Sequence, residues 1–179
     1  MKNAIILHGT GTLNTEFWFP YMKEKLEQSG YEVWLPQLPN SDFPNLEEWL
    51  TLVLTKGKFT SETILIGHSA GSQLILSILE KVSAKIKQAI LVSGYAEALR
   101  ENAISEIKPL LDWQKIKGNV GEIIFINSDN DPWGCDDTQG RIMLDNIGGT
   151  LIIPKGEGHM GSSTYNQPYK EFPLLSKLI

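Results

Sequence analysis

Six short apolar runs recur along the chain, and none of them alternates with polar residues. They cover residues 4–7, 33–35, 63–66, 89–92, 123–126 and 151–153, and they are rich in isoleucine, leucine and valine. Continuous apolar runs of this length are typical of strands that are covered on both faces, as in a parallel sheet. The sequence therefore predicts six buried strands.

The segments between these runs have a helical period instead. Apolar residues recur on one face within residues 18–26, 46–53, 74–82 and 142–147, and the most regular stripe follows residues 67–69. A closing helix is predicted over 173–179, with a proline in its first turn, and a further helix over 103–111, interrupted near residue 109. Strands and helices in alternation predict an α/β fold with a mostly parallel sheet.

Length and composition are those of one globular domain, with 41% hydrophobic and 21% charged residues. Together with the alternating pattern, they predict a single α/β domain over residues 1–179. Sixteen basic and 21 acidic residues give a net charge of -5, which argues against a nucleic-acid-binding protein. No apolar run approaches the roughly 20 residues of a membrane-spanning helix. The run at 4–7 is too short for a signal peptide. We therefore expect a cytoplasmic protein that does not associate with membranes.

The clearest chemical motif is Gly67-His68-Ser69-Ala70-Gly71, which lies between a predicted strand and the most regular amphipathic helix. A nucleophile elbow requires this context, because the turn is tight and only small residues can flank the serine. The serine hydroxyl is raised above the sheet, at a helix N-terminus that favours developing negative charge. Ser69 is the predicted nucleophile.

A serine hydroxyl needs an adjacent base, and the chain has only three histidines. His68 neighbours the serine in a tight turn, so its side chain is expected to point elsewhere. His8 ends the first strand and is expected to support the loop that follows it. His159 comes after the last strand on a glycine-rich loop, in the third place of the order Ser, Asp, His. His159 is the predicted base.

The acid that orients the imidazole is expected after the fifth strand. That loop offers Asp131, which is followed by Pro132, and also Asp129 as an alternative. Asp136 and Asp137 lie further on and are interpreted as exposed turn carboxylates. Asp131 is the preferred acid, while Asp129 stays open because predicted element boundaries err by two residues or more.

An acyl-transfer site also needs two N–H donors for the oxyanion. The backbone N–H of Ala70 is one, and the first loop is expected to supply the other at Thr10 or Gly11. The alternative interpretation of Gly9-x-Gly11 as a dinucleotide-binding loop fails, because the third glycine of that fingerprint would fall at Asn14.

No cofactor and no metal are expected. Three scattered histidines lack ligand spacing, and a single cysteine, Cys135, excludes both an intrachain disulfide and a cysteine-rich zinc site. Because the predicted serine is the better nucleophile, Cys135 is interpreted as incidental. Trp18, Tyr95 and Trp133 lie near the loops that carry the predicted site and are candidates to line a substrate pocket, although core packing is the more common role for any one of them. Trp133 is the preferred pocket residue because it follows Asp131 by two residues.

The sequence resembles the small serine hydrolase family of the α/β-hydrolase fold that includes retinoblastoma-binding protein 9 and its bacterial homologues. The resemblance covers nearly the whole chain. It rests on six segments beside the elbow: Ile6-Leu7-His8-Gly9, Phe17-Trp18, Ile90-Leu91-Val92-Ser93-Gly94-Tyr95, Trp113-Gln114-Lys115-Ile116-Lys117, Ser128-x-x-Asp131-Pro132 and Gly158-His159.

The resemblance implies a compact hydrolase without a large cap, the strand order 2-1-3-4-5-6, and the triad Ser69, Asp131 and His159. It implies esterase-type activity. The segment Trp133-Gly134-Cys135 departs from many relatives, which have an apolar residue and proline after the acid. A retinoblastoma-binding Leu-x-Cys-x-Glu motif is not present around the only cysteine, so that partner is not carried over.

These observations predict a serine hydrolase that acts on a small ester or thioester through an acyl-enzyme. An amidase or peptidase with the same triad is an alternative. A second alternative is a non-catalytic module that keeps the hydrolase fold for protein contacts, since fold alone does not establish function. All three triad roles are filled, which favours the enzyme. The sequence does not identify protein partners.

Overall fold

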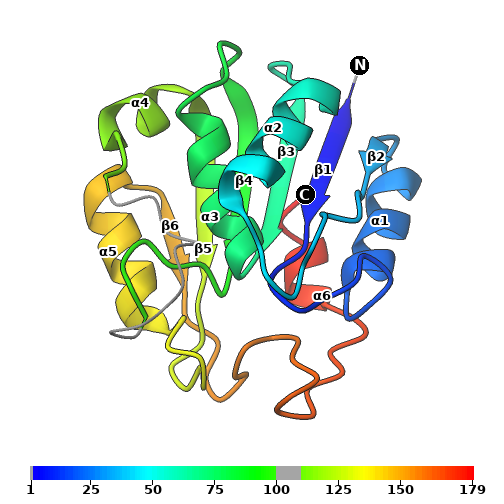
Figure 1. Cartoon of the computed structure of the whole chain (residues 1–179), viewed down its shortest axis with the longest axis vertical. Helices are drawn as coiled ribbons and strands as arrows, with labels where there is room; N and C mark the ends of the chain where they lie inside the picture. The colour runs from blue at the N-terminus through cyan, green and yellow to red at the C-terminus, as the bar shows by residue number, and fades with distance from the viewer. Residues whose placement is uncertain (1, 100–109) are drawn as a thin grey trace.

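Six parallel strands form the centre of the molecule. The computed structural model describes residues 2–99 and 110–179 (Figure 1). The strands are β1 (Asn3–Leu7), β2 (Glu32–Trp34), β3 (Thr63–His68), β4 (Ile86–Val92), β5 (Val120–Ile126) and β6 (Thr150–Ile152). They lie in the order β2-β1-β3-β4-β5-β6, and every pairing is parallel. This confirms the predicted α/β fold and the strand order that the family resemblance implies.

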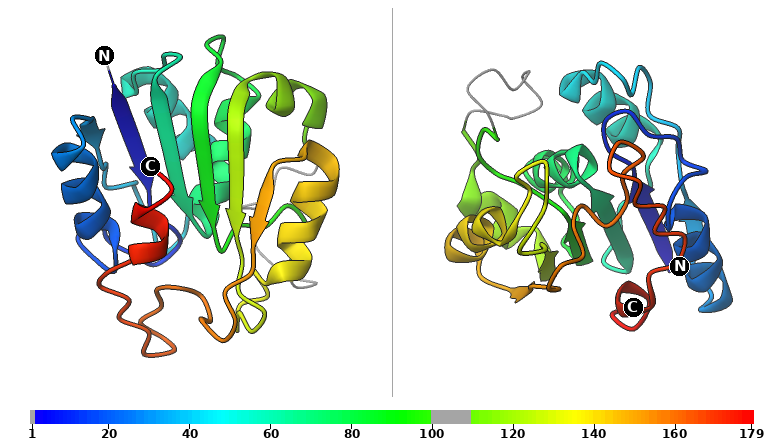
Figure 2. Two further views of the ribbon diagram at one scale, coloured as in Figure 1. Left: turned by 180° about the vertical axis from the view of Figure 1, so that it is seen from behind. Right: turned by 90° about the horizontal axis from the view of Figure 1, so that it is seen from below.

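Helices cover both faces of this sheet. They are α1 (Phe19–Gln28), α2 (Leu46–Lys56), α3 (Ala70–Leu79), α4 (Trp113–Gly118), α5 (Asp137–Ile147) and α6 (Pro173–Ser176). Seen from behind in Figure 2, α1 and α6 lie on one face of the sheet, and α2 and α3 lie on the other. Among the described residues, no helix has both the length and the apolar character that crossing a membrane requires.

The strands alternate between two cores, which explains why their sequences are apolar throughout. In β1, Ile5 and Leu7 pack into the core beneath α2 and α3, while Ala4 and Ile6 pack beneath α1 and α6. The central strands β3, β4 and β5 contribute to both cores in the same way. A strand covered on both faces has no place for exposed polar side chains.

The predicted helices at 18–26, 46–53, 74–82 and 142–147 correspond to α1, α2, α3 and α5. The closing helix is shorter than predicted, because α6 ends at Ser176. The helix predicted over 103–111 falls largely on residues 103–109, which lie outside the described residues. The sequence analysis did not predict α4, which Asp112 caps by accepting a hydrogen bond from the Lys115 N–H at 3.0 Å.

Parallel strands bring their carboxyl ends to one edge, and four loops follow them there. These loops begin after β1, β3, β5 and β6, and they are the segments from which the sequence analysis drew its candidate residues. The register keeps the ends level, since Leu7 pairs with Gly67 and His68 pairs with Val92. The fold therefore gathers serine, acid and histidine at one edge of the sheet.

Capping of α2 offers a direct test of this description. The Asn45 carboxamide oxygen accepts hydrogen bonds from the backbone N–H groups of Glu47 and Glu48, at 3.0 and 3.1 Å. We predict that Asn45→Ala lowers the free energy of unfolding by about 1 kcal/mol. Asn45→Asp keeps an acceptor at the helix start and is expected to retain most of the stability. Urea denaturation measures both variants, and an alanine variant as stable as wild type would contradict the assigned cap.

Candidate active site

Ser69 occupies a strained turn between β3 and α3. Its backbone has φ 54° and ψ −121°, a conformation that costs a non-glycine residue about 1–3 kcal/mol. The turn is held by the Ser69 N–H, which donates to the Val92 carbonyl at 2.9 Å. Ser69 is half-buried, so its hydroxyl is not sealed into the core. This is the geometry that the sequence motif predicted for an elbow.

Close backbone contacts explain the glycines on both sides of the serine. A Cβ on Gly67 would lie 2.6 Å from the Gly71 carbonyl oxygen, and a Cβ on Gly71 would lie 2.3 Å from the Leu7 carbonyl oxygen. Real Cβ atoms do not approach backbone oxygens so closely. The turn can therefore form only if both positions lack a side chain.

The loop after β1 runs directly beside the serine. A Cβ on Gly9 would lie 2.9 Å from the Ser69 Cβ and 3.5 Å from the Ser69 Oγ. The next residue, Thr10, is exposed, and Ala70 is the first residue of α3, where backbone N–H groups have no partner within the helix. The two segments from which the predicted oxyanion donors come, the loop at Gly9 and Thr10 and the start of α3 at Ala70, thus both lie next to Ser69 in space or in sequence.

His159 and Asp131 form a buried pair. The Asp131 Oδ2 accepts a hydrogen bond from the His159 Nδ1 at 2.7 Å, with the side chains 0% and 7% exposed. The other carboxylate oxygen, Oδ1, accepts from the Trp133 N–H at 2.8 Å. Because both oxygens are engaged, the carboxylate has one orientation, and the donating Nδ1 leaves the lone pair of the imidazole on Nε2.

Three consecutive side chains after β5 hold the loop that carries His159, and we call Ser128, Asp129 and Asn130 the loop clasp. Asp129 accepts from the Gly156 N–H at 2.7 Å, Ser128 from the Glu157 N–H at 3.0 Å, and Asn130 from the Gly158 N–H at 2.8 Å. The Ser128 hydroxyl also donates to Asn130 at 2.7 Å. Asp129, which the sequence left open as the alternative acid, is exposed and accepts from a backbone N–H. Asp131 is the carboxylate that is hydrogen-bonded to the imidazole.

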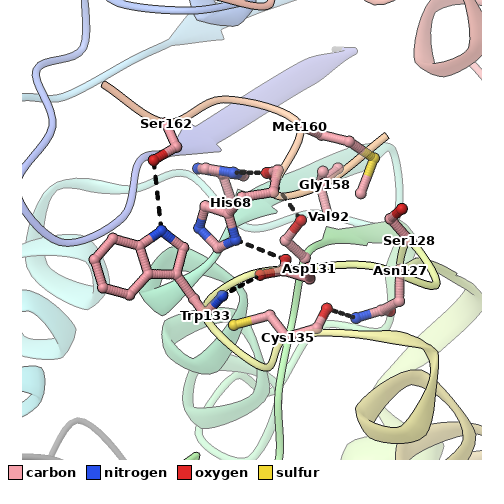
Figure 3. A network of polar contacts seen from close by, with 12 residues as sticks. His68, Val92, Asn127, Ser128, Asp131, Trp133, Cys135, Gly158, Met160 and Ser162 are labelled. Carbon is pink, nitrogen blue, oxygen red and sulfur yellow. Dashed lines mark hydrogen bonds and ion pairs between the residues drawn. The ribbon is translucent and has the colours of Figure 1, made fainter. Parts of the chain in front are cut away.

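The backbone of His159 is fixed on its other side as well. Its carbonyl accepts hydrogen bonds from the His68 Nε2 at 2.9 Å and the Ser93 hydroxyl at 3.0 Å (Figure 3). Its N–H donates to the Gln167 carboxamide at 2.9 Å. The His68 and His159 rings lie 4.7 Å apart, so the residue that precedes the serine anchors the candidate base.

The other two histidines have the structural roles that the sequence predicted for them. His8 is buried, and its Nε2 accepts from the Leu38 N–H at 2.8 Å, so Nδ1 carries the proton and donates to the Gly9 carbonyl. Burial lowers the pKa of His8. Burial, with a smaller contribution from the nearby His159, lowers the pKa of His68 to about 3. Both rings are therefore neutral near pH 7.

Of the three aromatic residues proposed for the pocket, only Trp133 has the required exposure. Trp18 is fully buried, and its indole N–H donates to the Met160 carbonyl at 2.9 Å. Tyr95 is 2% exposed, and its carbonyl accepts from the Gln73 side chain. Buried side chains cannot contact an entering substrate, so we correct the pocket prediction for Trp18 and Tyr95, which are core residues.

Trp133 lies over the site and is half-buried. Its ring meets the His159 ring edge-on at 6.4 Å and the Tyr165 ring at 5.2 Å. Its indole N–H points to the Ser162 hydroxyl at 3.5 Å (Figure 3). Tyr165 is 45% exposed. The two rings give one side of the site an aromatic wall, and sequence analysis missed Tyr165 because nothing in its own segment ties it to the loop after β5.

Sequence analysis also missed the residues that hold His159 by its backbone. These are Ser93, which donates to the His159 carbonyl, Asn130, which accepts from the Gly158 N–H, and Gln167, which accepts from the His159 N–H. Each is separated from its partner by between 8 and 66 positions in the sequence. Ser93 belongs to a segment that carried the family resemblance, and Asn130 stands beside the predicted acid. Membership of a family segment or nearness to the predicted acid could have pointed to Ser93 and Asn130, whereas no sequence feature pointed to Gln167.

A model of a known family matches almost the whole chain. The family is described as serine hydrolase, and the match covers residues 4–177. The rat serine hydrolase RBBP9 (Rattus norvegicus) is 29% identical over 164 residues, which are 89% of this chain and 87% of that protein. The putative hydrolase YdeN of Bacillus subtilis is 37% identical over 101 residues, which span 55% of this chain and 53% of YdeN.

Solved structures show the same architecture. The crystal structure of the B. subtilis ydeN gene product superposes with a TM-score of 0.90 at 27% identity, covering 99% of this chain and 96% of that one. Est1E from Butyrivibrio proteoclasticus has a TM-score of 0.71 at 16% identity, covering 99% of this chain and 89% of its own. The second likeness concerns the fold alone.

The low pKa of His68 leads to a prediction about acid stability. The unfolded chain binds a proton at His68 near pH 6.5, whereas the folded chain binds it only near pH 3. Stability from this group is therefore present above pH 6.5 and is lost as the pH falls toward 3. In His68→Gln, which keeps an N–H donor for the His159 carbonyl, we predict a shallower loss of stability over this range.

Denaturant unfolding at several pH values measures the two slopes. Comparison of the variant with wild type cancels the contributions of the carboxylates, which both chains share. Equal slopes for wild type and His68→Gln would contradict the assignment of a neutral, buried His68.

Proposed function

Because this chain belongs to the serine hydrolase family, we propose that it hydrolyses a small carboxylic ester or thioester through an acyl-enzyme on Ser69. The observation that carries this proposal is the pairing of a strained elbow serine with a buried His159–Asp131 hydrogen bond at the same sheet edge. A hydroxyl at such a turn becomes nucleophilic only beside a base, and a base of this kind works only if a third group orients it.

In the proposed reaction, the Ser69 Oγ attacks the substrate carbonyl carbon while the His159 Nε2 takes the hydroxyl proton. The Asp131 carboxylate accepts the Nδ1–H throughout and stabilises the imidazolium that forms. The backbone N–H groups of Ala70 and Thr10 bind the oxyanion. The imidazolium then gives its proton to the departing alcohol or thiol, which leaves the acyl group on Ser69.

Water completes the cycle by the same steps. The neutral imidazole takes a proton from a water molecule, whose oxygen attacks the acyl carbon. Collapse of the second tetrahedral intermediate returns the proton to the Ser69 Oγ and releases the carboxylic acid. No proton or electron is left over, so this route requires no cofactor.

The aromatic wall supports an ester with an apolar group. The Trp133 ring lies against the His159 ring, the Tyr165 ring lies against the Trp133 ring, and Tyr165 is the more exposed of the two. Aromatic rings contribute large apolar contact area with little loss of conformational freedom. We therefore propose that a short acyl or alcohol group packs against these rings.

Hydrolysis of a short p-nitrophenyl ester tests the proposal. We predict that Ser69→Ala abolishes hydrolysis and that Asp131→Asn lowers kcat by about two to four orders of magnitude. Asp129→Asn is the matched control, because its carboxamide oxygen can still accept from the Gly156 N–H. Equal loss in the two aspartate variants would contradict the assignment of the acid. A well-folded wild type without hydrolysis would favour a non-catalytic binding module.

The loop clasp gives a second prediction. Asn130→Ala removes the acceptor of the Gly158 N–H, next to His159, and small misplacements of a catalytic group are costly. We predict that kcat falls by about tenfold to a hundredfold while KM changes little. Asn130→Asp keeps the acceptor and is expected to recover most of the rate. A kcat of Asn130→Ala equal to wild type would show that the loop does not need this contact.

A further inference from the structure

Cys135 lies against the His159–Asp131 pair. One ligand atom from each of the three side chains can be chosen so that all three atoms lie within 4.8 Å of one another. All three residues are buried, with Cys135 1%, Asp131 7% and His159 5% exposed. Figure 3 shows the Cys135 side chain beside the segment that carries Asp131 and Trp133. The proposed reaction makes no use of this thiol.

The surrounding structure holds these donors in place. The Asn127 side chain donates to the Cys135 carbonyl at 2.9 Å and also to the Gly94 carbonyl at 2.8 Å, which fixes the backbone beneath the thiol. The Trp133 N–H occupies the Asp131 Oδ1, so Oδ2 is the oxygen that faces His159. The three donors therefore converge before any ion arrives.

Thiolate, imidazole and carboxylate together form a donor set suited to zinc and to the softer ion cadmium. Zinc bonds of about 2.0–2.3 Å place tetrahedral donors roughly 3.3–3.8 Å apart. Donors as far apart as 4.8 Å would need to close by about 1–1.5 Å, whereas the Asp131 Oδ2 and the His159 Nδ1, which lie 2.7 Å apart, would need to separate by about 0.6 Å as the ion replaces their hydrogen bond. We propose that Asp131, Cys135 and His159 bind a thiophilic divalent cation and that this ion inhibits the enzyme reversibly. The inhibition, though not the binding, rests on the proposed function.

The proton balance explains why the bound form would be inactive. The cation replaces the thiol proton of Cys135 and the proton on the His159 Nδ1, and both protons pass to water. The imidazole takes one proton back at Nε2, so one proton is released for each ion bound. A protonated Nε2 cannot accept the Ser69 proton, and Asp131 no longer orients the ring through a hydrogen bond.

Because the three donor residues are buried, an entering ion requires the loop between the acid and the cysteine to move. Pro132, Trp133 and Gly134 are only half-buried, although the residues at either end of this loop are buried. Gly134 has φ 84°, a conformation that favours glycine. As part of the proposal, this short segment is the one that moves when the ion enters.

Cadmium titration monitored by the ultraviolet thiolate-to-cadmium charge-transfer band tests the site directly. Because Cys135 is the only cysteine, any such band reports on this thiol. We expect a band that saturates at one equivalent in wild type, is absent in Cys135→Ala and is reversed by zinc. Asp131→Asn and His159→Ala are expected to weaken cadmium binding by about tenfold or more. Asp129→Asn is the matched control and should bind like wild type.

Ester hydrolysis supplies the second measurement, with each variant compared with its own metal-free rate. Zinc should inhibit wild type, EDTA should restore the rate, and Cys135→Ala should need about tenfold more zinc or higher. A cadmium affinity unaffected by both Asp131→Asn and His159→Ala, or zinc inhibition unchanged in Cys135→Ala, would overturn the proposal. Binding without any metal-free hydrolysis would instead count against the proposed function and leave the metal site standing.

Discussion

The structure depends on one close approach, where the start of α3 passes the end of β1. The Gly71 Cα lies so near the Leu7 carbonyl that a side chain there would reach within 2.3 Å of its oxygen. This contact sets the start of the helix directly against the sheet, next to the turn in which Ser69 has a φ of 54°. The backbone strain at Ser69 is local. The packing of the two cores around the sheet, which offsets this strain, extends over the whole domain.

Hydrogen bonds to main-chain groups complete what the elbow begins. The serine is placed by a turn between two regular elements, whereas His159 lies on a loop with no such support. Its loop is held instead by the loop clasp, by Gln167, and by two donors on its carbonyl, one of which is His68. A neutral His68 serves this purpose without placing a positive charge beside the proposed base. These hydrogen bonds give His159 a defined position although it lies on a loop.

The sequence predicted the parts of this arrangement that local pattern determines. Six apolar runs predicted the six strands, because burial on both faces requires apolar residues. The flanking glycines predicted the elbow around Ser69, because the close backbone contacts there leave no space for a side chain. The helix α4 was missed because six residues are too few to show a period, although Asp112 is a recognisable cap. The strand order came from the family resemblance rather than from pattern.

Other features of the site depend on the direction in which a side chain points, which cannot be inferred from the residue type. Asp129 and Asp131 could not be separated by sequence, since each stands in the same polar loop, and the contacts of Gly156 and His159 distinguish them. Trp18 was expected near the pocket because its position in sequence lies near the first loop, but the start of α1 turns it into the core. The proximity of Cys135 to the acid arises from the turn between them, at Gly134.

Covalent labelling by a fluorophosphonate shows whether Ser69 is an activated nucleophile, and it requires no knowledge of the natural substrate. We predict a single adduct that peptide mapping places on Ser69, absent in Ser69→Ala and formed far more slowly in His159→Ala. An unlabelled wild type that unfolds cooperatively, or an adduct on another residue, would contradict the claim that the elbow serine is activated by His159.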